Sequence, residues 1–179
     1  MNVNRPDMMR LSPGSALWKL GSIVVALAVF ALLARSAENT PGKELPLLLT
    51  WSGDFPVAEL QRLPERQQKS RTGYFGDTKA FAPVWHVFQP GGKTPEVDFD
   101  KNLVVFTRNV DFYNHTRIAG VKLADGVVDI IAIETMTSLP IEHKVAMALA
   151  VIPRADVKYI QSGHERITVI AKRPEQKSN

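Results

Sequence analysis

The chain of 179 residues contains no cysteine. A protein without cysteine forms no disulfide bond, has no thiolate nucleophile or cysteine metal ligand, and cannot be anchored to a membrane by a lipid-modified cysteine. The sequence also lacks an H-E-x-x-H zinc motif, a phosphate-binding loop and a G-x-S-x-G nucleophile motif. These absences favour a protein that is not an enzyme and that needs no cofactor.

Histidine is scarce and scattered. No two of the four histidines stand two or four residues apart, the spacings that place two metal ligands on one side of a strand or a helix. His115, Met136 and Met147 are the donors that would suit a copper site in an exported protein. Methionine is more common as a core residue, so the sequence predicts no metal ligands. A ligand- or metal-binding carrier is the alternative function.

The excess of positive charge lies near the N-terminus. The formal net charge is +4, with 22 Lys or Arg against 18 Asp or Glu. Residues 1–36 contain four of these basic residues and one of the acidic residues, so the rest of the chain is almost neutral. Because nucleic-acid binding requires basic residues clustered on a folded face, the sequence predicts no nucleic-acid partner.

A short apolar segment, Gly21–Ala34, follows the charged N-terminus. A membrane-spanning helix needs about 20 residues, and this shorter segment is typical of a signal-peptide core. Small residues at Ala34 and Ser36 suit cleavage after Ser36. The alternative is an uncleaved anchor at residues 17–34, with the charged end of Lys19 extended toward the membrane surface.

Either interpretation predicts an exported protein, because positive charge precedes the apolar segment and the rest of the chain then lies outside the cytoplasm. The expected location is the periplasm or another extracytoplasmic space, with attachment to the inner membrane if the anchor is retained. The predicted parts of the chain are a signal peptide or anchor (1–36), a linker (37–44), an exported β-rich domain (45–171) and a disordered tail (172–179).

The clearest structural signal is a β-hairpin within Arg117–Met136. Asp125-Gly126 separates two β-rich runs, and a two-residue turn of this type needs positive φ at both positions. With this turn, Lys122 faces Asp129, and the same register continued outward places Arg117 opposite Glu134. It also places four apolar residues on one face, which we predict to be the core face: Val121, Leu123, Val128 and Ile130.

A helix is predicted over residues 78–88, with Asp77 as its N-cap. Phe81, Trp85 and Phe88 recur at helical spacing and form an apolar stripe that is expected to cover the sheet. Pro83 is expected to kink or divide this helix.

Other segments give weaker signals. The sequence favours a first strand at 45–51, a short helix at 56–63, an exposed solvated segment at 65–72, a strand at 97–107 and a final hairpin at 157–171. Residues 141–152 alternate large and small side chains, which indicates a strand, although their helix propensity is also high. Pro153 and the β-rich run after it suggest that this strand continues into a meander.

The predicted fold class is therefore α+β. We expect a small antiparallel β-sheet or β-sandwich-like domain with one or two covering helices, preceded by the N-terminal signal or anchor helix.

The candidate functional segment is the polar and aromatic connection that leads into the hairpin. Loops of this composition are enriched in binding sites. The partner-contact candidates are Asn109, Asp111, Phe112, Tyr113, His115 and Arg117.

The order of elements from Asp77 to Pro153 resembles the C-terminal domain of PrcB-type protease-complex subunits. The sharpest motif is Val97-Asp98-Phe99 followed by the apolar run Leu103–Phe106. The chain departs from that family at the entry to the hairpin, where it has Asn114-His115-Thr116-Arg117. The resemblance implies a non-enzymatic accessory subunit that binds or stabilises another exported or membrane protein.

Overall fold

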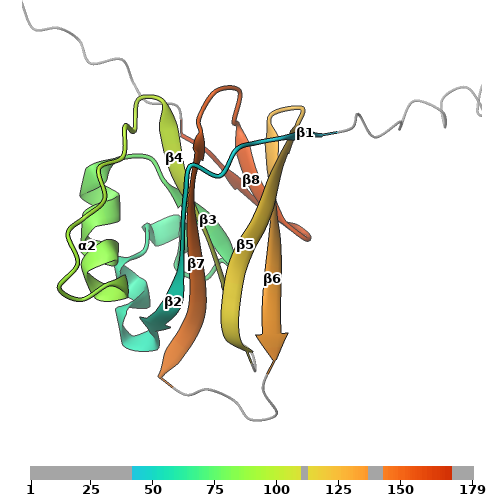
Figure 1. Cartoon of the computed structure of the whole chain (residues 1–179). Coiled ribbons are helices and arrows are strands. Elements are labelled where there is room, and N and C mark those ends of the chain that lie inside the picture. The colour runs from blue at the N-terminus through green and yellow to red at the C-terminus, as the bar shows by residue number, and fades with distance from the viewer. Residues whose placement is uncertain (1–41, 110–112, 137–142, 171–179) are drawn as a thin grey trace, which may run out of the picture. The chain divides into compact units, whose positions relative to one another are not determined.

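The computed structural model describes residues 42–109, 113–136 and 143–170, and at 113 and 114 it describes the backbone only. All of these residues belong to the unit that begins at Pro41. They form two β-sheets, one α-helix and two short 3-10 helices (Figure 1). The predicted α+β, sandwich-like character of the domain is confirmed. The N-terminal apolar segment lies outside the described residues.

The inner sheet contains four antiparallel strands in the order β2-β7-β4-β3. They are β2 (Leu49–Pro56), β7 (Lys144–Pro153), β4 (Asn102–Asn109) and β3 (Thr72–Phe75). Helix α2 lies on one face of this sheet, and strands β5 and β6 lie on the other (Figure 1).

The outer sheet has five strands in the order β1-β5-β6-β8-β9. They are β1 (Lys43–Glu44), β5 (Tyr113–Ala124), β6 (Val127–Met136), β8 (Tyr159–Ser162) and β9 (Glu165–Thr168). Strands β8 and β9 form the predicted final hairpin, but β8 pairs with β6 in parallel. The predicted meander is therefore wrong, because after Pro153 the chain crosses from one sheet to the other.

Strand β7 separates two apolar cores. Its larger side chains, including Met147 and Leu149, pack toward α2, whereas Ala148 and Ala150 pack toward the outer sheet. The predicted strand with one large and one small face is thus confirmed within the described residues. The small face leaves room for the outer sheet to pack against the inner one.

Helix α2 (Thr78–Phe88) begins where the sequence predicts. The Asp77 carboxylate accepts a hydrogen bond from Ala80 N at 2.8 Å, which satisfies an amide in the first turn of the helix. Phe81, Trp85 and Phe88 are buried against the inner sheet. Pro83 lies within the helix on its exposed side.

The Val97-Asp98-Phe99 motif leads into the turn before β4, so the strand predicted at 97–107 begins only at Asn102. Asp98 accepts a side-chain hydrogen bond from Lys101, which lowers the pKa of the Asp98 carboxyl group, and the backbone amides of Lys101 and Asn102 donate to its carbonyl at 3.1 and 2.8 Å. Phe99 is buried beneath α2. In this chain the motif therefore has a structural role.

The predicted hairpin register holds only near the turn. Lys122 pairs with Asp129 as expected, and the neighbouring apolar residues face the core. A β-bulge between Ile118 and Gly120 then shifts β5 by one residue. As a result Arg117 lies opposite Ile133 and not opposite Glu134, so the predicted Arg117–Glu134 pair is wrong.

Two other boundaries and the exposure of one segment differ from the predictions. The first long strand covers Leu49–Pro56, and the short helix after it is a 3-10 helix, η1 (Val57–Arg62). The segment predicted to be exposed contains a second 3-10 helix, η2 (Glu65–Gln67), and its Gln67 and Ser70 side chains are buried. None of the helices in the described residues is long and apolar enough to cross a membrane.

Replacing Gly73 with alanine is expected to destabilise the fold. A Cβ atom at this position would overlap Gln67 Oε1 and the Phe106 ring, both of which are buried. Overpacking of this kind costs about 1–3 kcal/mol in the free energy of unfolding. Gly120→Ala is the control, because its Cβ would meet no atom closer than 3.8 Å. Urea unfolding followed by tryptophan fluorescence measures both variants, and equal losses would contradict the packing described for Gly73.

Candidate functional site

The part of the β5–β6 ribbon farthest from its turn has open edges. Strand β1 pairs only with Lys122 and Leu123 of β5, and β8 pairs only with residues 127–129 of β6. In the described residues, no strand pairs with the outer edges of the ribbon beyond these points. We call residues 113–119 and 131–136 the distal half of the ribbon.

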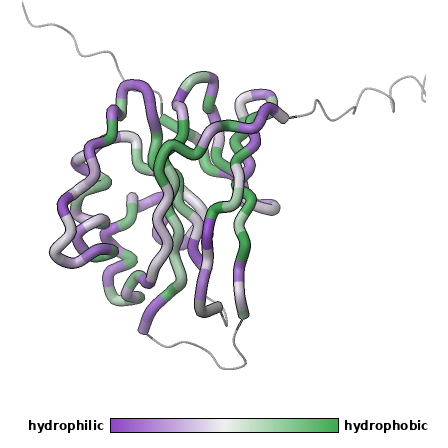
Figure 2. Tube along the Cα trace, in the orientation of Figure 1, coloured by the Kyte–Doolittle hydropathy of each residue, from purple (hydrophilic) through white to green (hydrophobic). Residues whose placement is uncertain are grey.

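The two faces of the ribbon exchange character along its length. Near the turn, Val128 and Ile130 point into the core and Asp129 faces solvent. In the distal half, Ile131 and Ile133 are 39% and 44% exposed on the outer face. Figure 2 shows β5 turning hydrophilic in this half while β6 keeps an apolar stretch beside it. The apolar pattern of β6 therefore changes face between Ile130 and Ile131.

Beyond the Ile118–Ala132 pair, polar side chains occupy the inner face of the distal half. Thr116 is 1% exposed, and its hydroxyl group has no hydrogen-bond partner among the described residues. Glu134 points away from the outer face and pairs with Arg71, which precedes β3, at 3.5 Å. The inner positions of this half are thus taken by polar side chains, one of which has an unsatisfied hydroxyl group. The isoleucines lie on the outer face.

Basic residues lie beside the two exposed isoleucines. Arg117 is directly across from Ile133, and His115 is across from Thr135. Both basic side chains are exposed. Gly120 is opposite Ile131 and has no side chain to cover it. We call the outer surface of His115, Arg117, Ile131, Ile133 and Thr135 the ribbon patch.

The structure separates the six predicted partner-contact residues. His115 and Arg117 belong to the ribbon patch, and Tyr113 begins β5. Asn109 is buried at the end of β4 with 1% exposure, so its side chain is not on the surface. Asp111 and Phe112 lie outside the described residues.

The sequence did not predict Ile131 and Ile133 as contact residues, because both fit an ordinary β-strand. The bulge near Ala119 sets which residues of β5 and β6 share a face, and no turn residue in the sequence indicates it. The detectable signal was the sequence Ile130-Ile131, where two consecutive apolar residues interrupt the alternation.

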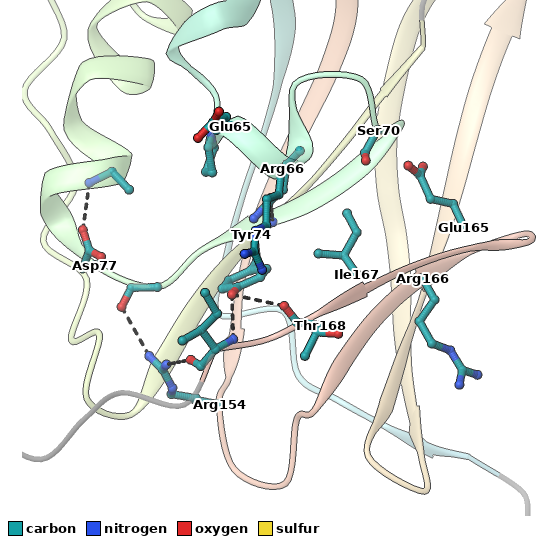
Figure 3. A pocket seen from close by; sticks show the side chains of 15 residues that line it. Glu65, Arg66, Ser70, Tyr74, Asp77, Arg154, Glu165, Arg166, Ile167 and Thr168 are labelled. Carbon is teal, nitrogen blue, oxygen red and sulfur yellow. Dashed lines mark hydrogen bonds between the residues drawn. The ribbon is translucent and has the colours of Figure 1, made fainter.

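A cavity of about 660 Å³ lies between the edge strands of the two sheets, β3 and β9 (Figure 3). Its lining also includes residues of η2 and the start of α2. The phenolic oxygen of Tyr74 accepts a hydrogen bond from Ile170 N at 2.7 Å and donates to Thr168 O at 3.4 Å. Tyr74 thus connects the two edges at the cavity.

Arg154 makes a second connection at the same place. Its guanidinium group donates to three backbone carbonyls, those of Gly76, Phe99 and Ile170, at 3.1–3.3 Å. These residues come from three separate segments of the chain. The cavity wall near β9 is therefore held by directed hydrogen bonds to Arg154 and Tyr74.

Arg108 holds the segment on the other side of the cavity. It is 3% exposed and donates to Ser70 O at 2.7 Å and to Gln68 O at 2.6 Å. Burial lowers the pKa of Arg108, and the negative charge of Glu165 opposes this shift. Glu165 also accepts from Arg71 N at 2.8 Å. Residues 68–71 are thus fixed by β4 and β9, which lie far from them in the sequence.

The described residues hold no group of three or more His, Asp or Glu side chains suited to a metal ion. Met147, one of the three possible copper donors, is buried under α2 and lies apart from the other two. His115 and Met136 are both at the distal end of the β5–β6 ribbon, where His115 is opposite Thr135.

Comparison of the chain with protein-family models, curated proteins and solved structures finds no match. The resemblance to PrcB-type subunits therefore stays a prediction.

Proposed function

We propose that this protein is a non-enzymatic accessory protein that binds another exported or membrane protein through the ribbon patch. The supporting observation is that the apolar residues of β6 pass from the inner to the outer face after Ile130. This change leaves Ile131 and Ile133 exposed beside Arg117. Solvent-exposed apolar side chains rimmed by polar residues are typical of protein interfaces. We attribute this outward-facing pair of isoleucines, on the solvent face of the outer sheet, to a partner that covers it.

The charge and apolar character of the ribbon patch indicate what kind of surface its partner presents. Arg117 and His115 favour carboxylate groups, and the isoleucines favour an apolar centre. The open edges of β5 and β6 offer unpaired backbone groups, to which an extended segment can add as a strand. The expected partner therefore presents an apolar segment flanked by acidic residues.

Export places this interaction outside the cytoplasm. The proposal includes retention at the membrane if the apolar segment 17–34 is not removed, and release if cleavage follows Ser36. Sequencing the N-terminus of the protein from its native cells tests this: we expect either Ala37, after cleavage, or the original N-terminus in the membrane fraction. A protein with its original N-terminus in the cytosolic fraction would contradict export.

The double variant Ile131→Thr/Ile133→Thr is expected to lose its partner. Threonine is β-branched and keeps strand propensity while removing apolar surface. Each contact residue contributes on the order of 1 kcal/mol or more if it is central to the interface, so recovery should fall at least about tenfold. Co-purification of the full chain followed by mass spectrometry measures this loss. Arg117→Glu is expected to act in the same direction.

Leu48→Thr/Val57→Thr is the matched control. Leu48 and Val57 are 49% and 44% exposed, similar to the two isoleucines, but they lie outside the ribbon. This variant should retain the partner, and both double variants should keep the wild-type melting temperature within about 2–4 °C. Equal recovery with the ribbon variant and with the control would exclude the ribbon patch as the contact surface.

A further inference from the structure

The cavity between β3 and β9 contains hydrogen-bond donors that the fold does not use. Gln67 is 5% exposed, and its Oε1 accepts from Tyr74 N at 2.7 Å. Because an amide N–H is a donor, the oxygen of Gln67 must face it, and the Nε2 group is left over. Gln67 Nε2 donates to no described residue and is not sealed from solvent.

Ser70 supplies a second unused group. It is 8% exposed and lines the cavity, and its backbone carbonyl is held by Arg108. Its hydroxyl group makes no hydrogen bond to the described residues and is also open to solvent. Two side chains that are more than nine-tenths buried therefore keep polar groups available at this cavity.

Arg66 adds a charged donor to the lining of the cavity. Its side chain is exposed, lines the cavity and has no ion-pair partner among the described residues. Figure 3 shows it extending from η2 toward Tyr74. A guanidinium group can hold a carboxylate through two parallel hydrogen bonds.

The acidic groups of the lining are mostly engaged elsewhere. Asp77 accepts from Ala80 N, and Glu165 accepts from Arg71 N, each at 2.8 Å. The lining holds three arginines and three acidic residues, so its net charge does not favour an anion. The hydrogen-bond donors without a partner are what favour an anionic ligand. Ile167 and Ile170 give the cavity an apolar side.

We propose that this cavity binds a small organic carboxylate. The carboxylate group accepts from Arg66, Ser70 Oγ and Gln67 Nε2, and the apolar body of the ligand lies against Ile167 and Ile170. The volume of about 660 Å³ is within the usual range for small-ligand sites. The ligand is either a free acid or the C-terminal carboxylate of a peptide, since both present the same group.

Titration of the full chain, followed by ¹H–¹⁵N NMR spectra, distinguishes these sources. The probes are hexanoate, N-acetyl-alanyl-leucine, the amide of the same dipeptide, and 1-hexanol. Shifts around Ser70 with hexanoate and with the dipeptide acid indicate a site for small acids in general. Shifts with the dipeptide acid alone indicate a peptide C-terminus. Equal binding of the amide or of hexanol, or no shift with any probe up to about 10 mM, would overturn the proposal.

Arg66→Ala should weaken binding of the acids about tenfold, and Ser70→Ala severalfold, because each removes a donor to a charged acceptor. Gln67 is left unchanged, since it also satisfies Tyr74 N inside the fold. Arg62→Ala is the control, because Arg62 pairs with Glu59 outside the cavity. If Arg62→Ala and Arg66→Ala reduced affinity equally, the proposed contact would be wrong. The ribbon variants should leave acid binding unchanged, so this site and the partner surface can fail independently.

Discussion

Strand β7 packs on two cores at once, and the remaining layers depend on how its side chains alternate. Met147 and Leu149 fill the space beneath α2, while Ala148 and Ala150 let the outer sheet pack against the inner one. A large residue on the small face would push the sheets apart, and a small residue on the large face would leave a cavity under the helix. The three-layer arrangement of helix, inner sheet and outer sheet follows from this alternation.

The same packing reaches its limit in the distal half of the ribbon. There the outer sheet turns Thr116 and Glu134 inward, toward the end of the sandwich that also holds Thr72. Less apolar surface is buried between the sheets where the inner face becomes polar. In the same part of the ribbon, the apolar side chains of β6 lie on the outer, solvent-exposed face. The surface proposed for partner binding is therefore a consequence of where the core between the two sheets ends.

The sequence predicted elements whose signals are local. Asp77 marked the start of α2, and Asp125-Gly126 set the hairpin and its register near the turn. It could not predict features that depend on distant residues. Hydrogen bonds with Arg108 and Glu165 hold the segment around Ser70 against the fold. The composition of this segment alone predicts that it is exposed to solvent. The β-bulge that sets Arg117 opposite Ile133 likewise has no local signal in the sequence.

Photo-crosslinking shows whether a partner covers the ribbon patch. A benzoylphenylalanine in place of Ile133, in the full chain expressed in its own cells, samples what lies against the ribbon patch. The same probe in place of Val57 samples a site with equal exposure, 44%, outside the ribbon. We expect an adduct with one defined protein from position 133 and none with that protein from position 57. Adducts of equal yield from both positions, or none from position 133, would contradict this expectation.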